Sequence, residues 1–431
     1  MNRISLTFPI SDTKLFKSKL LKWGNQHSVF SWLDSNNYQQ KHSSFEAVLA
    51  VEAISSIECS YHGAFEKLKK YRLQTKDYIF GFLGYDLKND LEDLHSKNYD
   101  GLHFPDLFFF QPKKIIKISE GQLIFSYLEA SQKEIKSDFE RIEQIDSRET
   151  AVANSDIKIK LRIHKDSYFQ KIDQVLKHIA RGDFYEANFC QEFYAENTAI
   201  DPISVYEKLN AISTPPFATC FKINDKYLLS ASPERYLKKV GNHVISQPIK
   251  GTEKRASNEK EDAELLKNLE SNPKERAENI MIVDLVRNDL SRIAKKGTVV
   301  VDELCKVYSF RQVHQLISTI SCEVNPDVDA VEIIKNSFPM GSMTGAPKIA
   351  AMKIMEQLEE TKRGLYSGAV GYFTPENDFD FNVIIRSILY NAQNRYISYS
   401  VGGAITNKSV PEKEYEECLL KAKAMKEVLL N

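Results

Sequence analysis

The chain has 431 residues, of which 42% are hydrophobic and 27% charged, a composition typical of a globular protein with two or three domains or one large one. Its 58 basic and 59 acidic residues leave a net charge of −1, so charge gives no reason to expect nucleic acid or a membrane surface as a partner. No apolar stretch approaches the about 20 residues that would span a bilayer.

The six cysteines stand singly, and none has the Cys-x-x-Cys spacing of a zinc site. The first 24 residues lack the continuous apolar block of a signal peptide because lysines interrupt them. We therefore expect a cytoplasmic protein with reduced thiols.

In chain order, residues 130–160 are rich in Lys, Glu, Asp and Ser, which predicts a solvated helix and a connection. This composition places a boundary between a first region, residues 1–155, and a second, residues 156–431. In the second region, apolar residues at helical spacing over 169–179 predict a helix that stops at Gly182.

Strand-like runs come next, at residues 227–231, 235–240 and 243–247, with a hairpin turn at Gly241-Asn242. Residues 257–290 have a helical pattern in which Asn272 is an N-cap for Pro273. Further helices are expected from Pro347 and from near Pro411 to the C-terminus. Because the strands cluster around hairpin turns, the sheets are expected to be antiparallel and the fold class to be α+β.

Two pairs of glutamates have a spacing that suits a metal ion. Glu275 and Glu278 share one face of a helix, and so do Glu414 and Glu417. If the two faces met, their oxygens would suit Mg²⁺, which also keeps some water. The competing interpretation is that each pair is an ordinary solvated helix face.

A second candidate is Lys250 in the run QPIKGT at residues 247–252. Pro248 fixes the entry to this loop and Gly251 allows a ligand to approach the backbone. A lysine kept neutral there would be a nucleophile, although a surface lysine on a turn has the same pattern. Glu234, at a strand junction, is a candidate general acid, with an ion pair to Arg235 as the alternative.

Two further runs suit anionic groups. The run GSMTGAPK at residues 341–348 leads into the helix expected from Pro347, and free N–H groups at such a helix start can hold an anion. Arg386 lies within an apolar run, where it needs either a ligand carboxylate or a structural ion pair.

Together these runs resemble the chorismate-utilising enzymes, which include anthranilate synthase component I, aminodeoxychorismate synthase component I, and the isochorismate and salicylate synthases. The resemblance covers Tyr168 to Lys426. It is carried by PIKGT at 248–252, ERAENIMIVDLVRNDL at 275–290, GSMTGAPK at 341–348 and EYEEC at 414–418. It implies a four-layer α/β/β/α fold in which two antiparallel sheets flank the active site and the first region contributes strands to them.

The resemblance also implies roles for individual residues. Glu278 and Glu417 match the main Mg²⁺ ligands, Glu275 and Glu414 match supporting carboxylates, and Glu234 matches the acid that protonates the departing 4-hydroxyl of chorismate. The other implied positions are the ring-carboxylate site (Gly341, Ser342), the enolpyruvyl-carboxylate pocket (Tyr366, Arg386, Gly402, Gly403), the histidine beside the ring (His314), a neighbouring polar contact (Thr252) and a further substrate-binding lysine (Lys421).

Lys250 indicates the branch of the family. Anthranilate synthases carry alanine at the matching position, whereas aminodeoxychorismate synthases carry lysine. The implied reaction has the Lys250 amine add at ring C2 while the 4-hydroxyl leaves, after which ammonia attacks C4 and expels the lysine. Because nearby glutamates should keep this lysine cationic, we expect it to be a competent nucleophile mainly with Mg²⁺ and substrate bound.

Glutaminases of this type carry a nucleophilic cysteine between glycines, and no cysteine here has that setting. The resemblance therefore implies a separate glutamine amidotransferase that supplies ammonia, on the route to 4-aminobenzoate and folate. No segment remains for a lyase domain, so 4-aminobenzoate itself is not the expected product.

Residues 29–35, VFSWLDS, resemble the family's tryptophan-pocket element, although Trp32 replaces an aliphatic residue. Tryptophan is thus a further candidate ligand, and a plain sheet strand is the alternative.

Two alternatives to the aminodeoxychorismate branch remain from the sequence. One is anthranilate synthase component I, which also removes pyruvate. The other is a non-catalytic subunit that binds chorismate or tryptophan, which would require losses at the metal or substrate positions.

Overall fold

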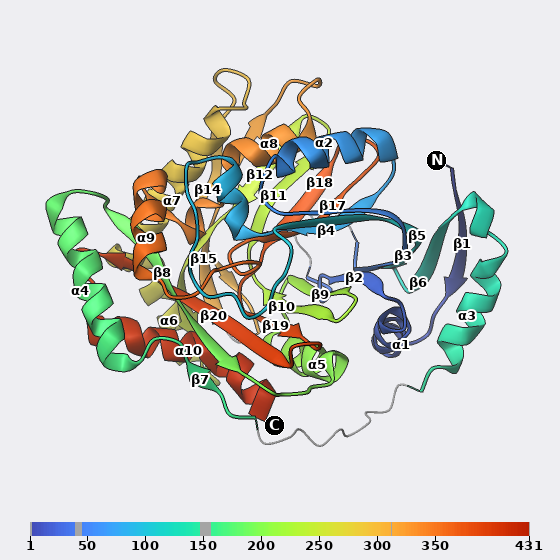
Figure 1. Ribbon diagram of the computed structural model, residues 1–431, viewed down its shortest axis with the longest axis horizontal. Coiled ribbons are helices and arrows are strands. Elements are labelled where there is room, and N and C mark those ends of the chain that lie inside the picture. Colours follow the sequence, from blue (N-terminus) through green and yellow to red (C-terminus); the bar gives the residue numbers. More distant parts are fainter. Residues whose placement is uncertain (1, 39–44, 147–156, 312, 431) are drawn as a thin grey trace.

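The computed structural model of the protein describes residues 2–38, 45–146, 157–311 and 313–430. The strands of this described chain form one continuous hydrogen-bonded network that bends into two sheets (Figure 1). The boundary predicted between residues 155 and 156 lies outside the described residues and stays a prediction.

The first sheet is antiparallel throughout, and short strands flank its last member. In spatial order it contains β1 (Arg3–Pro9), β6 (Gln122–Leu128), β5 (Leu107–Ser119), β3 (Ala47–Cys59), β2 (Val29–Asp34), β9 (Phe217–Ile223), β10 (Lys226–Ser232), β19 (Ser387–Asn391), β20 (Tyr396–Thr406) and β8 (Glu186–Ala195), with β7 (Lys160–Leu161) and β16 (Gly345–Ala346) on the far side of β8.

The second sheet is also antiparallel and starts from the other ends of β3 and β5. It continues through β4 (Ile79–Leu83), β17 (Ala369–Phe373), β18 (Phe379–Val383), β11 (Arg235–Val240), β12 (His243–Gln247), β15 (Val313–Glu323) and β14 (Val300–Ser309), and β13 (Ile249–Lys254) extends the β12 side of β15.

The sheets are joined because they share β3 and β5. Residues 47–51 of β3 pair with 114–118 of β5 in the first sheet, whereas 55–59 pair with 107–111 in the second. The bend between these halves coincides with a register shift between Ala53 and Ser55 and with a φ of 59° at Glu52. Strands from the N-terminal part of the chain therefore belong to both sheets.

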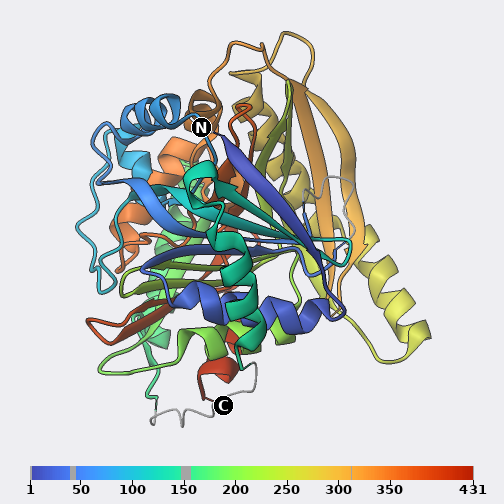
Figure 2. The ribbon, with the colours of Figure 1, turned by 90° about the vertical axis from the view of Figure 1, so that its right-hand side faces the viewer.

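Helices cover the outer face of each sheet, which gives the order helix, sheet, sheet, helix (Figures 1 and 2). This arrangement confirms the predicted α+β, four-layer fold. The first sheet is covered by α1 (Thr13–Asn25), α3 (Glu134–Gln144), α5 (Pro202–Ser213) and α10 (Pro411–Leu430), and the second by α2 (Ala64–Thr75), α7 (Pro273–Ser291) and α8 (Ala330–Ser337). The remaining helices are α4 (Lys165–Arg181) beside α10, α6 (Glu259–Ser271) beside β13–β15, α9 (Lys348–Leu358) on β8, and the 3-10 turns η1 (Tyr85–Asp90), η2 (Glu129–Ser131) and η3 (Gly341–Met343).

Aromatic side chains fill the space between the sheets. Phe221 of the first sheet packs edge-to-face against Phe82 and Phe110 of the second, with ring centroids 5.5 and 6.0 Å apart. All three side chains are buried. Such contacts contribute both apolar burial and favourable ring geometry, so they fix the separation of the two sheets.

Most elements predicted from the sequence lie within a few residues of those observed. The long helical pattern divides at Asn272, whose side chain accepts hydrogen bonds from the N–H groups of Lys274 and Glu275 and caps α7. Gly182 ends α4 in the left-handed region, with a φ of 88°. No helix among the described residues is long and apolar enough to cross a membrane.

Candidate active site

Two of the connections between the sheets each carry a predicted site residue. Glu234 lies between β10 and β11, and Arg386 lies between β18 and β19. Backbone hydrogen bonds fix both crossings: the N–H of Val383 donates to the carbonyl of Glu234 at 3.0 Å, and that of Ala231 donates to the carbonyl of Arg386 at 3.1 Å. The carboxylate and the guanidinium interact electrostatically across this junction.

Lys250 reaches from the second sheet to the first. Its Nζ lies 2.9 Å from Oε1 of Glu186, the first residue of β8, and the two side chains are 12% and 2% exposed. Burial disfavours the ammonium form of Lys250, but the adjacent Glu186 carboxylate, with help from Glu278 and Glu234, outweighs burial and raises its pKa. The lysine is therefore a buried cation, not a surface residue on a turn.

Glu234 is almost fully buried. Burial raises its pKa to about 7, although a hydrogen bond from Ser342 and the charges of Lys250 and Arg386 act against the rise. The Ser342 hydroxyl donates to Oε1 of Glu234 at 2.5 Å. A carboxyl group of this kind can hold a proton near neutral pH, which suits a general acid.

Ser342 and Gly341 reach Glu234 from a 3-10 turn. Gly341–Met343 form η3, and Gly345–Ala346 form β16, which pairs with β8 directly before α9 begins. The helix expected from Pro347 is thus observed, with Pro347 as its N-cap, and anion binding at Gly341 and Ser342 stays a prediction. A small cavity of about 20 Å³ lies against Glu234, Pro248, Gly341 and Ser342.

The two glutamate pairs lie on α7 and α10. The charge of Lys274, at the start of α7, acts on all four carboxylates, and Glu275 and Glu417 act on one another across the two helices. Burial raises the pKa of Glu278 to about 7, and it also raises those of Glu275 and Glu414.

These carboxylates have not converged into one coordination group. Among the described residues, no set of three or more His, Cys, Asp or Glu side chains is close enough to hold a metal ion. A divalent cation would nevertheless offset the charge of these carboxylates, of which Glu414 is buried and Glu275 and Glu278 are partly buried. Mg²⁺ binds through one or two carboxylates and several waters. The donor set therefore fits Mg²⁺ chemically.

Glycines bring both pairs close to the other site residues. Gly251 follows Lys250 in the chain and has a φ of 90°. A Cβ added at Gly251 would lie 3.1 Å from Oε2 of Glu275. The corresponding distance from Gly403 to Oε2 of Glu414 is 3.5 Å. Lys421 bonds to Glu417 and to the carbonyl of Gly402, at 2.8 and 2.9 Å, so it fixes α10 against β20.

Arg386 is the clearest candidate for anion binding. Its guanidinium makes no hydrogen bond or ion pair with another described residue, and its backbone has a φ of 51°. A partly buried arginine in a strained conformation is typical of a functional site. Tyr366 lies shortly before β17 of the second sheet. Its side chain is buried and forms a hydrogen bond with the thiol of Cys190.

His314 is not brought into this group. Both of its ring nitrogens are engaged, with Ser309 Oγ at 2.8 Å and Asp262 Oδ1 at 3.1 Å, and its side chain is buried between β14 and α6. Its neighbour Gln315 instead contacts Thr252, through Nε2 and Oγ1 at 3.4 Å. The predicted place of His314 beside a substrate ring therefore has no support from its contacts.

Two residues of the site were missed from the sequence. Glu186 has a detectable signal, a carboxylate at the head of the strand-like run EANFCQEFYA. Asn279 has none, since it is a polar residue in a helix. In the structure its side chain is buried and bonds to the carbonyls of Lys250 and Leu316 and to the Ser318 hydroxyl, which holds α7 against β13 and β15.

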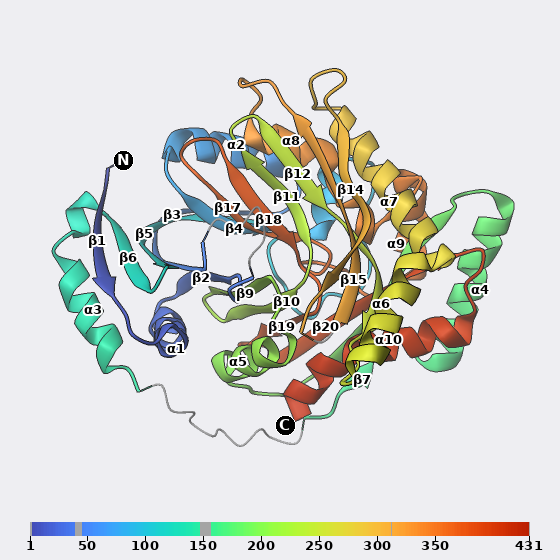
Figure 3. The same ribbon diagram turned by 180° about the vertical axis from the view of Figure 1, so that it is seen from behind.

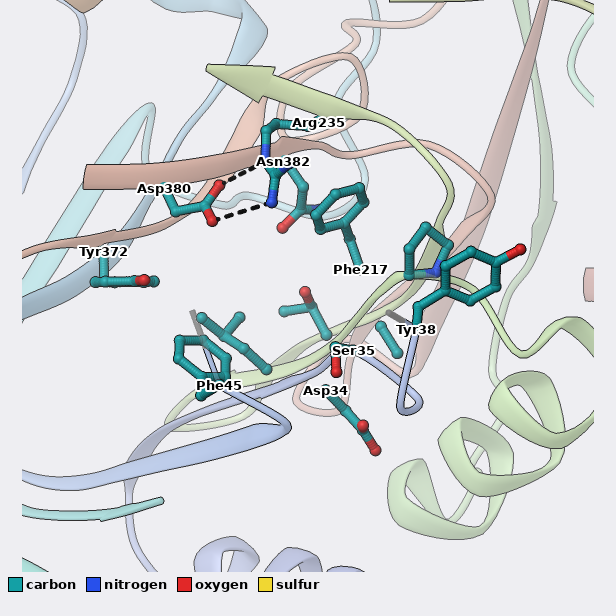
Figure 4. Close-up of a pocket in the computed structure, with 13 residues that line it drawn as sticks. Asp34, Ser35, Tyr38, Phe45, Phe217, Arg235, Tyr372, Asp380 and Asn382 are labelled. Atoms are coloured by element: carbon teal, nitrogen blue, oxygen red, sulfur yellow. Dashed lines mark hydrogen bonds and ion pairs between the residues drawn. The ribbon is translucent and has the colours of Figure 1, made fainter. Parts of the chain in front are cut away.

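A second cavity, of about 50 Å³, lies beside residues 29–35, the segment that resembles the family's tryptophan-pocket element (Figure 4). Residues 29–34 form β2, and Trp32 points to the outer core instead of lining the cavity. The acidic groups of the cavity are already paired, Asp34 with Lys17 and Asp380 with Arg235. The cavity has room for a few waters only, and tryptophan binding stays a prediction.

Comparisons with known proteins agree on one family. The profile of the family described as chorismate binding enzyme matches residues 27–427. An anthranilate synthase component I-like protein of Synechocystis sp. is 34% identical over 80% of this chain and 71% of its own length, and aminodeoxychorismate synthase component 1 of Bacillus subtilis is 32% identical over 81% and 76%. The crystal structure of anthranilate synthase component I from Streptococcus pneumoniae superposes with a TM-score of 0.79 at 25% identity, over 90% of this chain and 95% of that one.

The substitution Glu234→Gln should change how stability depends on pH. Because the pKa of Glu234 is about 7 in the folded state against an ordinary value of 4.5, the folded state holds the proton more tightly between these values, and the wild type loses stability as pH rises through them. At about 1.4 kcal/mol per pKa unit, the loss is on the order of 2–3 kcal/mol. Urea unfolding should show that the free energy of unfolding of Glu234→Gln, relative to that of the wild type, is higher at pH 8 than at pH 5 by this amount.

The exposed Glu270→Gln, on α6, is the control for that experiment, and it should give the same difference from wild type at both pH values. An advantage of Glu234→Gln that does not grow with pH would show that Glu234 is not held protonated by burial.

The substitution Asn279→Leu should lower the free energy of unfolding by about 1–3 kcal/mol for each buried partner left without a hydrogen bond. The exposed Asn288→Leu on the same helix should stay within about 0.5 kcal/mol of wild type. Equal effects of the two substitutions in urea unfolding would contradict the account of Asn279.

Proposed function

Because this chain belongs to the family of chorismate binding enzymes, we propose that it converts chorismate and ammonia to 4-amino-4-deoxychorismate. The observation that carries the proposal is Lys250, a primary amine buried where the two sheets meet and within electrostatic range of Glu234. A nucleophile that first displaces the 4-hydroxyl would open C4 to ammonia while the enolpyruvyl group stays in place. A buried amine paired with a protonated carboxyl group supplies both halves of that step.

The charges of the site suit a dicarboxylate substrate. Arg386, which has no hydrogen-bond or ion-pair partner in the described part of the chain, would bind the enolpyruvyl carboxylate, with Tyr366 and the amides of Gly402 and Gly403 around it. The ring carboxylate would lie toward the glutamate pairs, close to Gly341 and Ser342. The cavity beside Glu234 is too small for the ring as it stands, so substrate binding must widen it.

Glu278 and Glu417 would hold Mg²⁺ directly, with Glu275 and Glu414 supporting it partly through water. When bound, the ion would neutralise the ring carboxylate and the surrounding glutamates. Its positive charge would also oppose the carboxylates that keep Lys250 protonated. We therefore infer that Lys250 becomes a nucleophile mainly in the loaded enzyme.

The protein groups act in a definite order. The neutral Lys250 amine forms a bond to ring C2, the ring double bonds shift toward C4, and the C4–O bond breaks as Glu234 gives its proton to the departing hydroxyl, which leaves as water. Ammonia then adds at C4, the double bonds shift back, and the bond from C2 to the lysine nitrogen breaks. The proton lost from the added ammonia returns Glu234 to its acid form.

We propose that ammonia comes from a separate glutamine amidotransferase. The Bacillus subtilis relative is named as component 1 of its enzyme, which implies a second component. The buried thiols offer no alternative: burial raises the pKa of Cys190 and Cys220 well above the ordinary value for a thiol, which opposes the thiolate that a glutaminase needs.

A second candidate is anthranilate synthase component I, because relatives of similar identity carry that name. That reaction adds the amino group at C2 and then removes pyruvate. Lys250 argues against it, since its amine occupies the approach to C2 that ammonia would need.

Product identity tests the proposal directly. Purified chain with chorismate, Mg²⁺ and ammonium should yield 4-amino-4-deoxychorismate without free pyruvate, and glutamine should not replace ammonium until an amidotransferase is added. Lys250→Ala should lose this product by at least about 1,000-fold, because it removes the nucleophile. Release of anthranilate and pyruvate by the wild type would overturn the assignment, and glutamine use by the chain alone would overturn the partner.

Metal binding can be measured apart from activity. Isothermal titration with Mg²⁺ should show binding to the wild type, and Glu278→Gln or Glu417→Gln should weaken it by about tenfold or more. The exposed Glu416→Gln, one residue from Glu417 on α10, is the matched control and should bind as the wild type does. Unchanged affinity in Glu278→Gln and Glu417→Gln would place the metal elsewhere.

A further inference from the structure

The carboxylate of Glu186 has one partner and one open position. Its Oε1 accepts the hydrogen bond from the Lys250 ammonium at 2.9 Å. Its Oε2 is buried and has no hydrogen-bond partner among the described residues, although the side chain is only 2% exposed. A buried carboxylate oxygen without a partner is costly, and such groups cluster where chemistry requires them.

The backbone leaves Glu186 little freedom to move. It pairs with Thr406 of β20 on one side and with Ala346 of β16 on the other. A side chain at Gly345 would place its Cβ 2.3 Å from the carbonyl of Glu186, so β16 packs against β8 as closely as backbones allow. The carboxylate is therefore presented to Lys250 from a rigid element, as a reacting group should be.

The other described carboxylates that act on Lys250 are less well placed to take its proton. Glu234 must keep its own proton for the departing hydroxyl and accepts a hydrogen bond from Ser342. Glu278 acts on Lys250 only through space, and its nearest cation is Lys274, at 3.8 Å. Among the described residues, Glu186 is the carboxylate in hydrogen-bond contact with the lysine amine.

We propose that Glu186 is the general base that turns Lys250 into a nucleophile and later restores it. This inference rests on the proposed function. In the first step the Nζ–H bond breaks, the proton moves to Oε1 of Glu186, and the freed electron pair on Nζ forms the bond to ring C2. When ammonia later displaces the lysine, that pair returns to Nζ and the proton moves back from Glu186. No net proton is gained or lost by the pair.

A purely structural ion pair would behave in the opposite way. If Glu186 only held the ammonium, removing its charge would leave Lys250 easier to deprotonate and faster to react, because the neighbouring carboxylate opposes loss of the proton. If Glu186 accepts the proton, the same change leaves the amine without a base. General bases contribute about 100- to 10,000-fold to rate.

The test is the rate at which chorismate becomes attached to the full chain, without ammonia and with Mg²⁺, followed by rapid quenching and intact-protein mass spectrometry. Glu186→Gln should slow attachment by about 100- to 10,000-fold and leave chorismate affinity within a few-fold of wild type. Glu186→Asp should retain more activity than Glu186→Gln. In Glu186→Ala, added formate should restore part of the rate with saturation.

The matched control is Glu192→Gln on the same strand. Glu192 is also buried and paired, with Arg162 at 3.0 Å, but it has no contact with Lys250; its loss should change stability without slowing attachment. Attachment in Glu186→Gln that is as fast as wild type or faster would overturn the role of Glu186. Absence of any adduct in the wild type would instead overturn the proposed function.

Discussion

One buried ion pair, between Lys250 and Glu186, joins the two sheets at the candidate active site. Lys250 belongs to β13 of the second sheet and Glu186 to β8 of the first. Glu234 and Arg386 lie in the segments where the chain passes between the same two sheets. The position of each group thus depends on how the sheets are spaced, and the aromatic packing of Phe221 against Phe82 and Phe110 sets that spacing.

The electrostatics of the site follow from an excess of carboxylates over cations. Glu278 and Glu234 have pKa values raised to about 7 by burial, and Lys250 is their common neighbour. A site of this kind gains from any added positive charge, and it holds its lysine in the protonated form until such a charge arrives. Arg386 provides the complementary feature, a guanidinium with no hydrogen-bond or ion-pair partner among the described residues. These charges support the proposal that the site takes up a negatively charged substrate together with a cation.

Much of this arrangement could be predicted from the sequence. Asn272-Pro273 marked the start of α7, Gly182 the end of α4, and Gly241 the hairpin between β11 and β12, because each depends on local backbone chemistry. The four-layer fold came from the resemblance of whole runs to a known family, and the structure confirms it. Spacing also placed each glutamate pair on one helix face, since that is fixed by helix geometry.

What the sequence could not determine depended on contacts between distant segments. The helix expected from Pro347 is α9, but the pairing of Gly345–Ala346 with β8 just before it follows from no local pattern. His314 has both nitrogens engaged by Ser309 and Asp262, which are 5 and 52 residues away in the chain. Glu186 lies 64 residues before Lys250, so no local pattern could join them. How closely the two glutamate pairs approach each other likewise depends on how α7 and α10 pack, which spacing does not determine.

The central claim is that the Lys250 amine forms a covalent bond with chorismate. The most direct test is to quench the wild-type enzyme during reaction with chorismate and Mg²⁺ in the absence of ammonia, digest it, and locate the modified peptide by mass spectrometry. The account predicts a modification on Lys250 equal in mass to chorismate less one water, absent from Lys250→Ala. A stable adduct on any other residue, or turnover to 4-amino-4-deoxychorismate by Lys250→Ala at the wild-type rate, would contradict it.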